Sequence, residues 1–82
     1  MPTISEFYGI KIYMYFTEHE PSHIHVFHEG NVAVVDIKTG APLHGSLKPR
    51  ARKMVQEWVL LHQEELENIW NTKKMVKIAP LE

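Results

Sequence analysis

The sequence predicts an α+β fold in which a small antiparallel sheet of three or four strands is covered on one face by one long helix. Two observations predict this arrangement. In the first half of the chain, short segments rich in β-branched and aromatic residues alternate with turn signals, a pattern typical of antiparallel strands. From Ser46 onwards, apolar residues recur every three or four positions, which is typical of an amphipathic helix.

The first strand is expected at residues 8–16, YGIKIYMYF, where both faces are largely apolar or amphipathic. Residues 23–37 are expected to form a β-hairpin, because HIHVFH and VAVVDI flank the turn signal EGN. Gly40 marks a second tight turn, since glycine adopts positive φ without strain. A short edge strand, PLH at residues 42–44, is expected after that turn.

The helix is expected to begin after Ser46, a natural N-cap, and to run to about Trp70–Thr72. Pro49 is acceptable in its first turn, where its missing N–H has no partner to lose. The residues after the helix, KKMVKIAPLE, are expected to form a tail or an added edge strand. The apolar stripe of the helix consists of Leu47, Ala51, Val55, Trp58, His62, Leu66 and Ile69.

Length and composition restrict the class of protein. The 82 residues are expected to form a single domain, 1–82, whose stability depends on the 44% of hydrophobic residues, because the chain has no cysteine. Dimerisation or a cognate partner would add buried surface to so thin a core. No leader and no membrane-spanning run is visible, so we expect a soluble, cytoplasmic protein without membrane contact. The net charge of −1 argues against non-specific wrapping of nucleic acid.

Residues 18–30 contain the main candidates for chemistry. His23 and His25 are two positions apart on a strand, so both rings project from one face, with Cβ atoms roughly 7 Å apart. Both rings can therefore reach one metal ion or one phosphate group. This segment holds four of the six histidines: His19, His23, His25 and His28.

The register of the hairpin decides which histidine meets Asp36, the only aspartate in the chain. A turn at residues 29–30 places Asp36 opposite His23, whereas a turn at residues 30–31 places it opposite His25. A carboxylate on one ring nitrogen fixes the tautomer and raises the basicity of the other nitrogen. Both registers stay open at this point.

Two simpler interpretations compete with catalysis. The histidine face can be the solvated side of a hairpin whose Ile24 and Val26 point inwards, although Phe27 makes that face partly apolar. A metal site would need a third ligand. Asp36, His19 and His44 are the candidates, but none of these spacings is diagnostic.

Three further residues complete the candidate site. His62 lies on the apolar stripe of the helix and would join the site only if that stripe packed against the histidine face of the sheet. Arg50 and Arg52 belong to the basic segment KPRARK at the helix N-terminus, where their guanidinium groups could bind phosphate. The same arginines also fit an ordinary solvated helix end.

Several segments together resemble one bacterial family, the domain of unknown function numbered 4160. They are ISEFYGIKIYMYF, HEPSHIHV, VVDIKTG, GSL and EWVLLHQEELENIW, in the family's order and over almost the whole chain. The resemblance implies a small prokaryotic protein, often encoded beside a small protein of the family numbered 2442, in what looks like a toxin–antitoxin pair. The family's characteristic positions fall on His19, Pro21, His23, His25, Asp36, Gly45, Trp58, His62 and Trp70. Many members have Pro-Pro where this chain has Pro21-Ser22.

The leading hypothesis is therefore a component of a type II toxin–antitoxin module that cleaves RNA without a metal or other cofactor. His23 and His25 would be general acid and base, Asp36 would orient one ring, and Arg50 or Arg52 would neutralise the phosphate. The alternative is a non-enzymatic module that binds the cognate small protein encoded nearby, and a His-x-His metal-binding protein is the third possibility.

Overall fold

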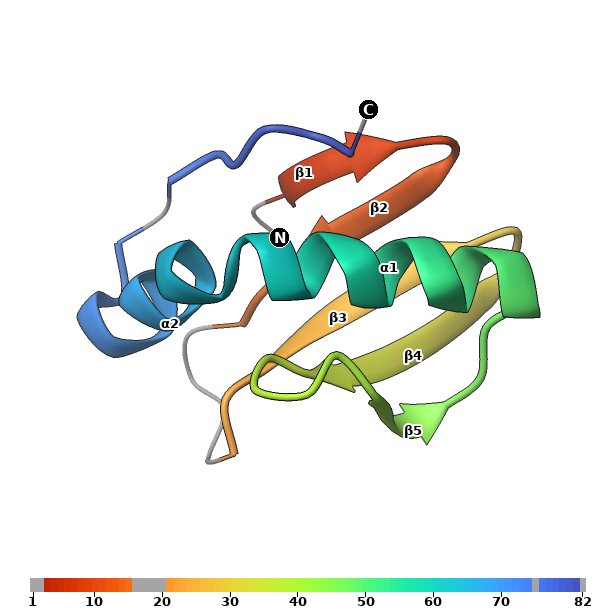
Figure 1. Ribbon diagram of the computed structural model, residues 1–82, viewed down its shortest axis with the longest axis horizontal. Helices are drawn as coiled ribbons and strands as arrows, with labels where there is room; N and C mark the ends of the chain where they lie inside the picture. The colour runs from red at the N-terminus through yellow and green to blue at the C-terminus, as the bar shows by residue number, and fades with distance from the viewer. Residues whose placement is uncertain (1–2, 16–20, 75, 82) are drawn as a thin grey trace.

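The computed structural model describes residues 3–15, 21–74 and 76–81 and has an α+β fold. Five antiparallel strands lie side by side in their order along the chain, β1-β2-β3-β4-β5, and the helices form a second layer over the sheet (Figure 1). The elements are β1 (Thr3–Phe7), β2 (Ile10–Tyr13), β3 (His23–His28), β4 (Asn31–Asp36), β5 (Pro42–Gly45), α1 (Pro49–Leu61) and α2 (Gln63–Thr72).

The strand count corrects the expected three or four. Residues 8–16 do not begin as a strand, because Tyr8 and Gly9 have φ of 50° and 75° and form a tight turn between β1 and β2. These left-handed conformations are those of a type I′ hairpin turn. Tyrosine is not a usual residue at the first of the two positions, so the turn and the strand before it were missed.

The hairpin expected at residues 23–37 is confirmed. β3 pairs with β4 from His23 opposite Asp36 to His28 opposite Asn31, with Glu29 and Gly30 at the turn. The first of the two registers is therefore the observed one. The short edge strand is also confirmed as β5, which pairs with β4.

The expected single long helix is divided in two at His62, whose φ of −119° leaves the helical range. The His62 N–H donates to both Trp58 O and Val59 O, at 3.1 and 3.2 Å. Beside the break, the side-chain amide of Gln63 donates from Nε2 to Ile37 O and Lys38 O, at 3.1 and 2.7 Å. These bonds tie the second helix to the turn after β4, so the break lets α2 follow the end of the sheet.

The helix also begins later than expected. Lys48 is the N-cap and Pro49 the first helical residue, whereas Ser46 lies outside the helix. Proline favours the first helical position and disfavours helical geometry in the residue before it, which explains the shift.

The helices cover the face of the sheet that carries Ile24 and Val26, and the core lies between the two layers. The apolar stripe predicted from the sequence faces this core, with Trp58 fully buried. The main contributors are Ile10, Ile12, Ile24, Val26, Ala33 and Val35 from the sheet and Ala51, Val55, Trp58, Val59, Leu66 and Ile69 from the helices.

The C-terminal segment runs back beside β1 (Figure 1). The Ile78 N–H donates to Ile4 O at 3.0 Å, and the Trp58 indole N–H donates to Ala79 O at 2.9 Å. Residues 76–81 thus join the sheet to the helix layer without forming a strand. In the part of the chain described here, no helix combines the length and apolarity needed to cross a membrane.

Candidate functional site

The sheet face opposite the helices, called the open face below, carries the His-x-His pair. The His25 ring stacks on Tyr13, with centroids 5.5 Å apart and planes 13° apart, and it meets the edge of Tyr15 at 4.6 Å. The His23 ring lies 5.3 Å from His25 and 5.0 Å from the Trp70 ring of α2. These five residues form the ring cluster, which holds both histidines against aromatic neighbours.

Asp36 lies opposite His23 in the register, but the two side chains make different hydrogen bonds. The Asp36 carboxylate accepts the Lys38 N–H at 2.8 Å, which closes the turn after β4. His23 Nδ1 lies 2.8 Å from Pro21 O. Because a carbonyl oxygen only accepts, Nδ1 of His23 must carry the proton, and Nε2 is the basic nitrogen of the neutral ring.

Packing restricts what the two histidines can do. His23 is 9% exposed, and the Nε2 atom of His25 is buried within the ring cluster. Both rings are thus held in fixed orientations by aromatic contacts. Rings held in this way can form part of a rigid binding surface, as well as transfer protons to a substrate.

The ring cluster changes the ionisation of Tyr13. Burial is the larger cause and the charge of Tyr15 the smaller one, and both raise the pKa of Tyr13 above its usual 10.0. We expect the contribution of Tyr13 to stability to be complete below pH 10 and lost as the pH rises through its folded-state pKa, because the unfolded chain ionises first. Ultraviolet absorbance of tyrosinate, compared between the parent and Tyr13→Phe, measures this pKa. A Tyr13 pKa at or below 10 would contradict the expectation.

His62 does not join the ring cluster. Its Nδ1 lies 2.7 Å from Glu65 Oε1, and its ring is 5.2 Å from that of Trp58 in the core. The helix stripe packs on the face of Ile24 and Val26, so the sheet separates His62 from His25.

The two arginines are also apart from His23 and His25. Arg50 lines a pocket at the far end of β3, together with His28 and Tyr8. Along a strand, the Cα atoms of His23 and His28 are about 17 Å apart, which places Arg50 beyond reach of the His-x-His pair. Arg52 is exposed on α1 and does not line this pocket.

Tyr8 was not among the sequence candidates, and His28 was one of the four histidines of residues 18–30 but was not assigned to the site. The alternation of β3 contained a signal for His28, because it shares the parity of Ile24 and Val26 and therefore faces the helix layer. The sequence did not indicate Tyr8, because tyrosine is not a usual residue in a hairpin turn and the turn was therefore not predicted.

The candidate metal ligands are also dispersed. His44 is exposed on β5, opposite Val34, and His19 lies outside the described residues. Within residues 3–15, 21–74 and 76–81, no group of three or more histidine, aspartate or glutamate side chains is placed to hold a metal ion.

No curated protein and no solved structure matches this chain. A family model described as "Domain of unknown function (DUF4160)" matches residues 9–71, which cover β2 to β5, α1 and nearly all of α2. The match includes His23, His25 and Asp36, and it agrees with the resemblance seen in the sequence. Since it spans well over half of the 82 residues, the chain belongs to this DUF4160 family.

Proposed function

We propose that this protein is one component of a toxin–antitoxin-type module and that it acts by binding its cognate small protein through the open face of its sheet. The observation that carries the proposal is a cross-strand apolar pair on that face. Phe27 of β3 and Val32 of β4 lie opposite each other and are 39% and 49% exposed. Contiguous exposed apolar side chains are typical of protein interaction sites.

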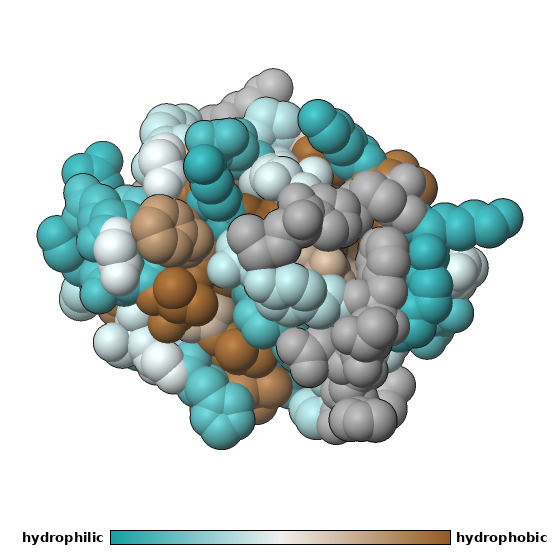
Figure 2. Space-filling model, turned by 180° about the vertical axis from the view of Figure 1, so that it is seen from behind, coloured by the Kyte–Doolittle hydropathy of each residue, from teal (hydrophilic) through white to brown (hydrophobic). Residues whose placement is uncertain are grey.

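The surroundings of this pair support an interface. Phe27 and Val32 have the parity of His25, so the apolar pair and the ring cluster share the open face. Seen from behind, the molecule shows hydrophobic side chains gathered among hydrophilic ones (Figure 2). Aromatic side chains inside a polar rim are the usual composition of the centre of a protein interface.

The partner we assign is the small protein encoded beside genes of this family. The resemblance to family members implies such a neighbour, of the family numbered 2442. The helices cover the face that carries Ile24 and Val26, whereas Phe27 and Val32 on the opposite face are exposed, so this part of the open face is accessible to a partner. In this proposal His23 and His25 hold in place the side chains that contact the partner, and they do not transfer protons.

The test is the affinity for the neighbouring protein, measured by calorimetry with the Phe27→Asp variant. We expect a loss of about 2 kcal/mol, roughly a 30-fold rise in Kd, because a carboxylate at the centre of an apolar interface is desolvated without a partner. Melting temperatures of the free variants show that the change acts on binding and not on folding.

Leu61→Asp is the matched control, because Leu61 is 67% exposed but lies on α1, in the opposite layer. It places the same new charge at an exposed leucine and should leave the Kd within about twofold of the parent. Equal weakening by both variants, or no binding of the neighbouring protein by the parent, would contradict the proposal.

Metal-independent RNA cleavage is the second candidate. It is favoured by the two neighbouring imidazoles of His23 and His25 on one face of the sheet, with ring centroids 5.3 Å apart, because paired histidines can act as general acid and base. Growth after induced expression tests it, with and without the neighbouring gene. Arrest by the parent that is relieved by His25→Ala, together with cleavage of RNA by the purified parent, would support catalysis. Growth arrest unaffected by His25→Ala would exclude His25 as a catalyst.

A further inference from the structure

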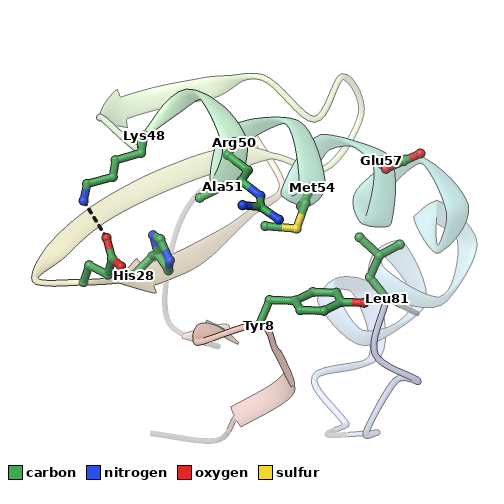
Figure 3. A pocket seen from close by; sticks show the side chains of 9 residues that line it. Tyr8, His28, Lys48, Arg50, Ala51, Met54, Glu57 and Leu81 are labelled. Carbon is green, nitrogen blue, oxygen red and sulfur yellow. Dashed lines mark hydrogen bonds and ion pairs between the residues drawn. The ribbon is translucent and has the colours of Figure 1, made fainter.

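A pocket of about 700 Å³ lies at the end of the sheet where two hairpin tips approach the first turn of α1. Tyr8 comes from the tip between β1 and β2, and His28 and Glu29 come from the tip between β3 and β4. Arg50, Ala51 and Met54 of α1 and Leu81 complete most of the wall (Figure 3). The volume falls in the range of small-molecule sites.

Arg50 supplies a cation that forms no ion pair with any carboxylate of the described residues. Among the described residues, the ion pairs are Lys48 with Glu29, at 2.6 Å, and His62 with Glu65. Lys48 and Glu29 thus satisfy each other, and this contact and the nearby charge of His28 lower the pKa of Glu29. Glu57, the other carboxylate of the wall, points away from Arg50 (Figure 3).

His28 contributes a polar ring to the wall of this pocket. Its Nδ1 atom is buried and has no hydrogen bond to any described residue, which is unusual for a buried ring nitrogen. The ring lies beside the tip glycine Gly9, where an added Cβ would be 4.0 Å from Cδ2 of His28. Because His28 forms part of the pocket wall, its imidazole N–H can donate to an acceptor atom of a ligand.

Tyr8 gives the pocket a flat apolar wall. Its side chain is 62% exposed, and Met54 and Leu81 continue the apolar surface beyond it. Tyr8, at φ 50°, and Glu29, at φ 48°, each occupy the first position of a two-residue type I′ turn, so each hairpin tip presents a side chain at this pocket.

We propose that this pocket binds a nucleoside phosphate, with the phosphate on Arg50 and His28 and the base against the Tyr8 ring. A guanidinium matches the oxygens of a phosphate, and an exposed aromatic ring accepts a base by stacking. A phosphate alone or a base alone would occupy only part of this pocket, whereas a nucleotide can contact Arg50 and Tyr8 together. The site lies on the helix side of the sheet and is independent of the open face, so it goes beyond the function proposed above.

The test is an NMR titration of the full chain with AMP, adenosine, ribose 5-phosphate and a short single-stranded RNA. We expect AMP to shift the amide signals of Tyr8, His28 and Arg50, and to bind more tightly than either of its two parts. Tighter binding of the RNA than of AMP would identify an RNA chain as the source of the nucleotide. Equal binding of the two would identify a free nucleotide as the ligand. No shift of these signals at millimolar AMP or RNA would overturn the proposal.

Arg50→Gln and Arg52→Gln form a matched pair of variants on the same turn of α1. We expect roughly a tenfold or larger rise in the Kd for AMP with Arg50→Gln and a change within about twofold with Arg52→Gln. Tyr8→Asn removes the ring while supplying a residue favoured in this turn, so it should weaken AMP but not ribose 5-phosphate. Equal effects of the two arginine variants would show a general charge effect and would overturn the proposal.

Discussion

Replacing Trp58 with alanine is expected to lower the free energy of unfolding by about 3–5 kcal/mol, the largest loss that we expect from a single substitution. Trp58 is completely buried, and its ring lies 5.7 Å from that of Phe7 in β1. Its indole N–H also donates to Ala79 O, so one side chain joins the helix, the sheet and the C-terminal segment. Since small domains have about 5–15 kcal/mol in total, this loss is a large fraction of the stability of the fold.

Urea denaturation followed by circular dichroism measures this loss. Trp58→Phe keeps most of the buried area and removes the N–H, so it separates packing from the hydrogen bond to Ala79 and should cost less than the alanine variant. Leu60→Ala, at a neighbouring position that is half exposed, should change the stability by about 1 kcal/mol or less. A Trp58→Ala loss no larger than that of Leu60→Ala would show that this core contributes little.

Gly45→Ala is expected to cost about 2–4 kcal/mol, because two penalties act at once. Gly45 has φ 73°, a conformation that alanine adopts only with strain. An added Cβ would also lie 2.2 Å from Val32 O and 3.0 Å from the Cα of Ala33. These are backbone atoms of the adjacent strand, so the clash cannot be relieved by turning a side chain.

Gly30→Ala is the matched control for Gly45→Ala. Gly30 has φ 79°, and an added Cβ would meet nothing within 4 Å. It therefore carries the conformational penalty alone, about 1 kcal/mol. Chemical denaturation of both variants gives the difference, which measures the contact between β5 and β4. Equal losses would mean that the edge strand moves away at little cost.

The sequence predicted those parts of the fold that depend on periodicity. The β3–β4 hairpin and the buried stripe of the helix follow from alternating or helical spacing, the edge strand β5 follows from the turn signal at Gly40, and the structure confirms all three. β1 was missed because the turn at Tyr8 lacks the usual asparagine or aspartate. The break at His62 was missed because it depends on the bonds from Gln63 to the turn after β4, which no local pattern contains.

The candidate site was less predictable than the fold. Parity correctly grouped His23 with His25, and one of the two expected registers brought Asp36 opposite His23. Parity could not show that the helix would cover the other face, which separates both histidines from His62. Arg50 lies beside His28 because α1 begins near the tip of the β3–β4 hairpin. This proximity depends on the tertiary fold, and no local sequence pattern indicates it.

The order of the elements has a consequence for synthesis of the chain on the ribosome. Every strand pairs with its neighbour along the chain, so the sheet has its full set of strands at Gly45, before any residue of the helices is made. At typical rates of translation, residues 46–72 require about 1 to 5 s. During that interval Ile24 and Val26 have no covering layer, so the face of the nascent sheet that later packs on the helices is an uncovered apolar surface. We therefore expect chaperone binding to this protein to be greatest during translation, before α1 has left the ribosome.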